Sequence, residues 1–463
     1  MEKFAFIIHP IDVRRDAGRK YPPLRFLPTR AIEKLMEKMS PKLASHVLGV
    51  ESLTGARAEG WLVVCPLSPR QFLDLPIEMV YDKIAAAGKL GADQGAKIVG
   101  LGASTSVVGD AGISVARRLD GIINVTSGNS YTVYTALEGL LRAAEMMGVD
   151  IPSSRLAIIG ANGSIGAVCA RMMAQTVRDI ALVGRDRDKL ETLRLSIERG
   201  ETSDDVAAES NSGANLHQKT PHDNFNGAAT SRSALYNGAA GDNSLNGGAS
   251  SNGALNGGAS SGGALNGGAL RNDASSGGVS SGGARMSTHG AATSARLASV
   301  WVASDIKSAL RDADLILAVT GATDALIFPE DLKSGAVVCD VARPRDVSRR
   351  VVEERDDVLV IEGGVIAVPG PVNFNFNFGF PDKTAYACMS ETMLMALEGT
   401  YEPYTLGRDL TESQVRRIGE IAHRHGFKLA GFRAFERAVS DETIAHVRAC
   451  AARKRASRQP VVT

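Results

Sequence analysis

The feature that most constrains the fold is a glycine-rich turn at residues 160–166, which reads Gly-Ala-Asn-Gly-Ser-Ile-Gly and has the spacing G-x-x-G-x-x-G. An apolar strand is expected directly before it, at 155–160, and a helix directly after it, at 167–175. Glycines let the backbone approach a pyrophosphate, and a helix N-terminus offers free N–H groups and a partial positive charge. Because the turn has both flanking elements, it predicts a dinucleotide site. The residues assigned to it are Gly160, Asn162, Gly163, Ser164, Ile165 and Gly166.

Apolar strands and helices alternate on both sides of this turn. Such alternation predicts a parallel sheet with helices on both faces. We therefore expect an α/β fold of two domains, one a Rossmann-type doubly wound parallel sheet and the other an α/β substrate domain. The expected strands are 97–102, 155–160, 180–184, 299–303, 315–319, 336–340 and 358–362, and the expected helices include 77–90, 112–119 and 133–147.

Residues 201–296 interrupt the second domain with a segment dominated by Gly, Ser, Asn and Ala. Leu-Asn-Gly-Gly-Ala recurs there from Leu245, Leu255 and Leu265. The segment has too little apolar bulk to form a core, so it is predicted to be a disordered spacer, the alternative being a partner-binding or assembly segment. The expected organisation is a substrate and catalytic domain (1–132), a Rossmann domain in two parts (133–200 and 297–380) around the insert (201–296), and C-terminal helices with a basic tail that return to the substrate domain (381–463).

The residue after the second strand of the Rossmann domain indicates the cofactor. It is Arg185, and arginine suits the 2′-phosphate of NADP(H), although the neighbouring Asp186 would favour NAD(H). Thr320 and Gly321 follow a later strand and are expected to cover the nicotinamide side. The sequence therefore predicts an NADPH site, and we assign no metal ligands.

Composition excludes several function classes. Lys+Arg 52 against Asp+Glu 51 leaves a formal charge of +1, so no overall attraction to nucleic acid or anionic lipid is expected, and any basic site must be local. The five cysteines form no Cys-x-x-Cys pair, which argues against a zinc site or a disulfide framework and favours a reducing, cytoplasmic location. No apolar run reaches the roughly 18 residues needed to span a bilayer, and the first residues do not form a secretory signal.

Cys388 is the candidate nucleophile. It lies in the early turns of a helix expected to begin near Asp382, and a helix N-terminus favours the reactive thiolate. Glu391 lies one turn further on and could move a proton, although its negative charge would also oppose thiolate formation. The alternative is that Cys388 is only packing, since its helix also carries Met389 and Met393.

Several motifs together resemble the long-chain acyl-[acyl-carrier-protein] reductases, NADPH-dependent enzymes that form fatty aldehydes. The resemblance covers nearly the whole chain except the insert, and the chain also departs from the family where Asn and Phe alternate over 373–380, which leaves substrate choice open. The motifs lie at 100–106, 126–132, 160–166, 185, 362–364, 387–391, 407–408 and 425–427.

The resemblance implies that Cys388 takes an acyl group as a thioester, which NADPH then reduces to an aldehyde. The implied substrates are long-chain acyl-ACP or acyl-CoA, and the implied partners are an acyl carrier protein and an aldehyde-consuming enzyme. Ser130 and Thr132, with Gly128 and Asn129, are expected to line the cleft beside Cys388 and Glu391. The candidates to line an acyl tunnel are Phe374, Phe376, Phe378, Phe380, Met389 and Met393.

Two other functions stay open. One is an NADP-dependent dehydrogenase of a small hydroxy or amino acid, as the looser resemblance to shikimate-type dehydrogenases allows. That enzyme would want a Lys–Asp pair in the first domain, but Lys83, Lys89 and Lys97 have no motif-defined acid partner. The other is a sensor that binds NADP(H) and signals through the insert.

Overall fold

The computed structural model describes residues 1–20, 22–205, 297–377 and 379–458. The predicted insert therefore lies, apart from its first five residues, outside the described residues, as does Phe378. No helix in the described part of the chain is both long and apolar enough to cross a membrane.

The first sheet has five strands in the order β2-β3-β1-β4-β5. Neighbouring strands are parallel except for the antiparallel pair β2 and β3. Along β1 the side chains alternate, with Phe4 and Phe6 in one core and Ala5 and Ile7 in another, so both faces of the sheet are covered. The strands are β1 (Glu2–Ile8), β2 (Lys42–Glu51), β3 (Arg57–Val64), β4 (Ile98–Leu101) and β5 (Asn124–Thr126).

Helices cover both faces of this sheet. α4 (Ile77–Asp93) packs on the face of Ala5 and Ile7, and α13 (Ala387–Leu397) on the opposite face. The helix carrying Cys388 was expected to begin near Asp382, which is wrong, because β13 (Thr384–Tyr386) pairs with β12 (Val365–Ala367) and delays its start. The other helices of this part are α1 (Val13–Lys20), η1 (Pro22–Phe26), α2 (Thr29–Glu37), α3 (Pro69–Asp74), α5 (Ser104–Val107) and α6 (Ile113–Arg118).

The second sheet has six strands, all parallel, in the order β11-β10-β9-β6-β7-β8. The chain proceeds outward from β6 to one edge and then from β9 to the other, which is the Rossmann order and confirms the predicted doubly wound sheet. Ligands of such sheets bind at the carboxyl ends of the strands where the order reverses, here between β6 and β9. The strands are β6 (Arg155–Ile159), β7 (Asp179–Val183), β8 (Ser299–Val302), β9 (Leu315–Ala318), β10 (Val337–Asp340) and β11 (Leu359–Glu362).

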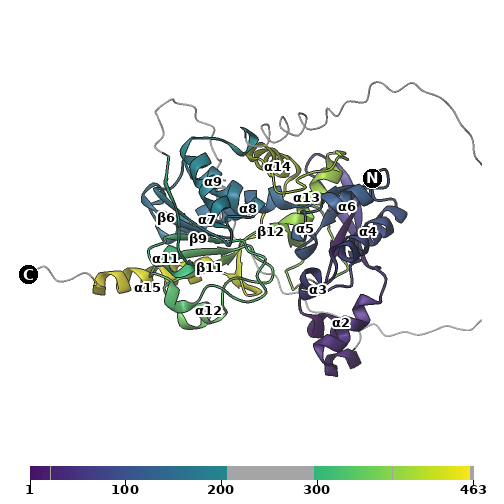
Figure 1. Ribbon diagram of the computed structural model, residues 1–463, viewed down its shortest axis with the longest axis horizontal. Coiled ribbons are helices and arrows are strands. Elements are labelled where there is room, and N and C mark those ends of the chain that lie inside the picture. The colour runs from purple at the N-terminus through teal and green to yellow at the C-terminus, as the bar shows by residue number, and fades with distance from the viewer. Residues whose placement is uncertain (21, 206–296, 378, 459–463) are drawn as a thin grey trace, which may run out of the picture. The chain divides into compact units, whose positions relative to one another are not determined.

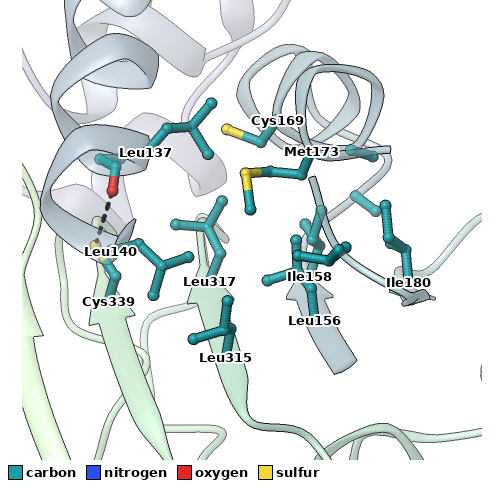
Figure 2. Packing of buried hydrophobic residues seen from close by; sticks show 14 of the residues in the cluster. Leu137, Leu140, Leu156, Ile158, Cys169, Met173, Ile180, Leu315, Leu317 and Cys339 are labelled. Atoms are coloured by element: carbon teal, nitrogen blue, oxygen red, sulfur yellow. Dashed lines mark hydrogen bonds between the residues drawn. The ribbon is translucent and has the colours of Figure 1, made fainter. Parts of the chain in front are cut away.

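Helices also cover both faces of the second sheet (Figure 1). Leu156 and Ile158 of β6 face the helices α7, α8 and α9, whereas Ala157 and Ile159 face α11 and α12. Figure 2 shows Cys169 and Cys339 packed among the leucines of the first of these cores. These helices are α7 (Asn129–Met147), α8 (Ser164–Met173), α9 (Arg187–Glu198), α11 (Ile306–Leu310) and α12 (Arg350–Glu354).

α7 carries the chain from the first sheet to the second. Two residues separate it from the end of β5, and it begins four residues earlier than expected. It then packs against α8 and β10. Asn129, Ser130 and Thr132 therefore lie in the first turn of a helix whose later turns belong to the core of the second sheet. The remaining elements are η2 (Ile151–Ser153), η3 (Pro329–Asp331), α14 (Glu412–His425), β14 (Lys428–Leu429), β15 (Phe432–Ala434), β16 (Arg437–Val439) and α15 (Asp441–Arg458).

Candidate active site

The glycine-rich turn joins β6 to α8 as the sequence predicts. Gly160 has a φ of +99°, and a Cβ built there would lie 2.9 Å from the carbonyl oxygen of Val319 on the neighbouring strand connection. A side chain at this position would be both strained and obstructed. Gly163 precedes the first residue of α8, Ser164, so the N-terminal N–H groups of α8 stand at the carboxyl end of β6. That arrangement suits a bound pyrophosphate.

The two polar residues after β7 have different roles. Asp186 caps α9 by accepting the N–H of Lys189, and its carboxylate also pairs with the Lys189 ammonium at 3.2 Å. Asn162 of the glycine turn donates to the Asp186 carbonyl at 2.7 Å, which ties the two loops together. Arg185 is exposed, lines the cavity described below and makes no ion pair with any described residue. The Asp186 carboxylate is thus engaged by Lys189, while the Arg185 guanidinium is available to a ligand in the cavity.

Thr320 and Gly321 follow β9. The N–H and hydroxyl of Thr320 both donate to the fully buried carboxylate of Asp346, at 2.9 and 2.5 Å, which fixes the loop. Both residues line the same cavity as Arg185. The loop after β9 and the loop after β7 therefore open onto one space.

That space is a cavity of about 1670 Å³. Ligand pockets usually measure about 300–1,000 Å³, so this one has room for more than one small molecule. One part of its wall is formed by strand ends of the second sheet, with Ile165, Arg185 and Thr320. Another part is apolar and is formed by residues of the first 40, including Leu24, Ile32, Leu35, Met36 and Met39.

Cys388 stands at the wall of this cavity, as the second residue of α13. It is partly exposed, whereas the other four cysteines are buried. Burial raises the pKa of the Cys388 thiol to about 12, the nearby Glu391 carboxylate adds to this, and the N–H groups of Met389 and Ala103 oppose it. Burial of the thiol therefore outweighs the N–H groups at the helix N-terminus, which lower its pKa as the sequence predicts.

Gly128 lets α7 approach Cys388 closely. A Cβ built on Gly128 would lie 2.3 Å from the Cβ of Cys388, and the residue has a φ of +76°. The next residue, Asn129, also lines the cavity and is only 3% exposed. Its side-chain nitrogen has no hydrogen-bond partner among the described residues. A buried amide donor without a partner is costly, so this nitrogen is suited to a ligand oxygen.

Glu391 is fully buried and does not line the cavity. Its Oε1 accepts the hydroxyls of Thr126 at 2.5 Å and Thr405 at 2.9 Å. Its Oε2 accepts the hydroxyl of Ser130 at 2.7 Å and the N–H of Tyr131 at 2.9 Å. One carboxylate therefore joins the N-terminal turns of α13 and α7, which carry Cys388 and Asn129.

His9 and Ala103 complete the surroundings of the thiol. Ala103 has a φ of +48°, unusual for a residue with a side chain, and such strain is found at functional sites. The next N–H, that of Ser104, donates to His9 Nε2 at 3.1 Å, so Nδ1 carries the ring proton and donates to the Pro10 carbonyl. Burial lowers the pKa of His9 to about 4, so the ring is neutral and holds this loop.

The structure brings some of the sequence-predicted residues to the cavity and not others. Seven of the predicted catalytic, cleft and cofactor residues line it: Asn129, Thr132, Ile165, Arg185, Thr320, Gly321 and Cys388. The other residues of the glycine turn (Gly160, Asn162, Gly163, Ser164 and Gly166) are not among the lining residues, and Glu391 and Ser130 lie behind the wall. Of the tunnel candidates, Phe376, Phe380 and Met389 line it, while Phe374 and Met393 are buried in the core. None of the described lysines Lys83, Lys89 and Lys97 reaches it.

Sequence reasoning missed His9, Ala103 and the apolar wall formed by the N-terminal residues. One signal was available for His9, because it directly follows β1 at the carboxyl end of a parallel strand, where ligand-contacting loops gather. Among the described residues no group of three His, Cys, Asp or Glu side chains could hold a metal ion.

The raised thiol pKa predicts how Cys388 reacts with iodoacetamide. Because only the thiolate reacts, the alkylation rate should rise about tenfold per pH unit from pH 7 to pH 9 without a plateau. An ordinary thiol, with a pKa near 8.5, would begin to level off in this range. Mass spectrometry of the α13 peptide measures the rate, and a plateau at about pH 8.5 would contradict the assigned environment.

Comparisons with known proteins add to this geometry. No family model matches the chain. Aminotransferase PigE of Serratia sp. is 24% identical over 438 residues, 92% of this chain and 39% of that protein. The long-chain acyl-[acyl-carrier-protein] reductase of Synechococcus elongatus is 19% identical over 311 residues, 65% of this chain and 61% of that protein. The solved structure of a dipicolinate synthase subunit from Bacillus halodurans is 12% identical, with a TM-score of 0.26, over 57% of this chain and 58% of that one.

These relatives are enzymes, but each is distant. The chain spans 39% and 61% of the lengths of the two curated relatives. The structural match is too weak to carry an argument, so the fold assignment rests on the strand order of the second sheet.

Proposed function

We propose that the protein reduces a long-chain fatty acyl thioester to an aldehyde, with NADPH as the reductant and Cys388 as the residue that carries the acyl group. The observation that carries this proposal is the position of Cys388. Of the five cysteines it alone is partly exposed, and it lies at the wall of a cavity that is also lined by loops at the strand ends of the Rossmann sheet. The similarity to the Synechococcus reductase supports the same reaction.

In the first half-reaction Cys388 Sγ attacks the thioester carbonyl and the carrier sulfur leaves. Because the pKa of Cys388 is raised, its proton passes to the departing carrier sulfur as the new thioester forms, so that no free thiolate accumulates. The partnerless side-chain nitrogen of Asn129 is a donor for the carbonyl oxygen as negative charge develops on it. The acyl group then remains on Cys388.

The residues present fit a dinucleotide. The α8 N-terminus would hold the pyrophosphate, Arg185 the 2′-phosphate, and Thr320 and Gly321 the nicotinamide side. When bound, the cofactor supplies the hydride that reduces the acyl group. As the aldehyde forms, its carbon–sulfur bond to Cys388 breaks, and the released sulfur takes a proton from water and returns to its thiol state.

The apolar wall supports a long acyl chain as substrate. Leu24, Leu35 and Met36 offer apolar contact without polar groups that a hydrocarbon would leave unpaired. Burying each methylene contributes about 0.8 kcal/mol, so a chain of many carbons is strongly favoured over a short one.

The test of this proposal is intact-protein mass spectrometry after mixing the wild-type chain with a long-chain acyl-CoA, and separately with an acyl carrier thioester, without NADPH. We expect one acyl adduct, located on the peptide of α13, that disappears as aldehyde when NADPH is added. NADPH binding without an adduct from either donor would contradict covalent catalysis and favour the small-acid dehydrogenase.

Arg185 should determine the preference for NADPH. Replacing it with alanine removes the charged contact to the 2′-phosphate, so KM for NADPH should rise about 10–100-fold while KM for NADH stays unchanged. Arg187→Ala is the matched control, since Arg187 is also exposed but does not line the cavity. Equal effects on the two cofactors would show that Arg185 does not contact the phosphate.

The name of the Serratia relative does not favour aminotransfer by this chain. Enzymes of that kind hold pyridoxal phosphate on a lysine. One lysine, Lys42, is among the described residues that line the cavity, and it is exposed on the edge strand β2, so it does not offer an enclosed site for that cofactor. This chain corresponds to 39% of that relative's length, so its name describes a longer protein.

A further inference from the structure

The segment 13–42, which contains α1, η1 and α2, stands apart from the large cores. Its own core consists of Val13, Ile32 and Met36, against which Leu24 and Met39 pack. The four other clusters each contain many more buried residues. The segment is therefore a small helical unit between β1 and β2 of the first sheet. Its core is too small to bury all of its side chains, so part of its surface faces solvent.

This segment is strongly basic although the whole chain is nearly neutral. It contains nine Lys and Arg against three Asp and Glu, a formal charge of +6 in a chain of +1. Arg30, Lys34 and Lys38 recur every four residues along α2, so they share one face of that helix. All three are exposed, and none forms an ion pair with a described residue. The positive charge is thus presented to the surroundings and is not neutralised within the described part of the chain.

Large apolar side chains are exposed beside this charge. Phe26 is 75% exposed, Leu27 41% and Leu35 47%. Leu35 follows Lys34 on α2 and also lines the large cavity. Exposed leucine and phenylalanine next to a basic helix face form the combination that helices lying at a membrane surface use, with apolar side chains entering the acyl region and cations meeting the headgroups.

We propose that the segment 13–42 docks on an anionic lipid bilayer, with Phe26, Leu27 and Leu35 entering the interface and Arg30, Lys34 and Lys38 contacting lipid phosphates. The inference goes beyond the proposed reaction and does not depend on the chemistry of Cys388. The proposed association is peripheral, with the segment lying at the membrane surface.

The composition of this surface favours a bilayer over an acidic protein. Protein interfaces are enriched in arginine and depleted in lysine, because a planar guanidinium makes paired hydrogen bonds that an ammonium cannot. The whole segment holds five arginines and four lysines, so this argument applies to the α2 face, where two of the three cations are lysines. Clusters of lysine and arginine beside an apolar surface are instead typical of binding to anionic lipids.

Docking there would bring the apolar wall of the cavity to the lipid surface. Leu24, Ile32, Leu35, Met36 and Met39 belong to the docking segment and line the cavity as well. A hydrocarbon chain could then pass between the bilayer and the cavity without crossing water. Crossing water would be costly, because each exposed methylene loses about 0.8 kcal/mol of burial free energy.

Co-sedimentation of the full chain with vesicles tests the proposal. Phosphatidylcholine vesicles containing phosphatidylglycerol should bind the wild type, whereas pure phosphatidylcholine vesicles should bind it far more weakly. Arg30→Glu/Lys34→Glu/Lys38→Glu should weaken binding by about 100-fold or more, because each cation near an anionic surface contributes about 1 kcal/mol. Raising the salt from about 0.1 M to 1 M, which shortens the screening length from about 10 to 3 Å, should also weaken it.

The matched control is Arg117→Glu/Lys307→Glu/Arg311→Glu, which makes the same change in net charge at exposed cations outside the segment. It should bind within about threefold of the wild type. Phe26→Ser keeps every charge and should bind about tenfold more weakly, so the test does not depend on the folding of the triple variant.

Equal binding of the two triple variants, or equal binding to neutral vesicles, would overturn the proposal. Binding to an acidic carrier protein that the α2 variant loses, without binding to vesicles, would overturn it in favour of a protein partner.

Discussion

Replacing Cys388 with alanine should abolish aldehyde formation, lowering kcat/KM for the acyl thioester by roughly 10⁴-fold or more, the scale seen when a nucleophile is removed. The reason is that no other described cysteine can take the acyl group. The other four, Cys65, Cys169, Cys339 and Cys450, are buried, and none of them lines the cavity. NADPH affinity should stay within about twofold of the wild type, because the glycine turn and Arg185 are untouched.

Cys450→Ala is the control that removes a thiol without touching the cavity. Cys450 is buried on α15 and does not line the cavity, so activity should remain within about threefold of the wild type. Steady-state rates with a long-chain acyl-CoA and with an acyl carrier thioester measure both variants. A Cys388→Ala enzyme that keeps a tenth of the wild-type activity would show that hydride transfer needs no acyl-enzyme.

Local pattern was enough to predict the second sheet but not the start of α13. The strand at 155–160, the glycine turn and the helix after it follow from neighbouring residues alone, and the structure has all three. The residues before Cys388 also permit a helix, yet they form β13, because β12 supplies a partner about 20 residues earlier in the chain. The sequence does not reveal that pairing, so the helix was expected to begin too early.

The surroundings of the thiol depend on contacts between distant parts of the chain. Ser104 and His9 are 95 residues apart, and Thr126 and Glu391 are 265 apart. No sequence motif indicates that these pairs are in contact. The neutral imidazole of His9 and the buried carboxylate of Glu391 could therefore be identified only from the structure. The roles assigned to Cys388, Thr132 and Arg185, and the domain boundaries drawn from the sequence, stay predictions.

Replacing Glu391 with alanine should destabilise the protein more than any other single change at the site. Four donors, three of them hydroxyls and one a backbone N–H, would lose their acceptor in a place that water does not reach. We expect a loss of roughly 3–5 kcal/mol, and a thermal midpoint lowered by roughly 5–10 °C. Ser130→Ala, which removes one of the four donors and leaves the carboxylate in place, should cost only about 1 kcal/mol.

Glu391→Gln distinguishes a positioning residue from a proton carrier. The amide oxygen can take the place of Oε2 and accept from Tyr131 N–H, which cannot turn around. The amide NH₂ then faces the hydroxyls of Thr126 and Thr405, which can rotate to accept. Stability should therefore recover to within about 1–2 kcal/mol of the wild type. If Glu391 acts by holding α13 against α7, kcat should recover to within about tenfold, with an unchanged pH profile. A glutamine variant as stable as the wild type but as inactive as Cys388→Ala would show that the carboxylate moves a proton. Its burial behind the cavity wall and its four donors argue for the first outcome.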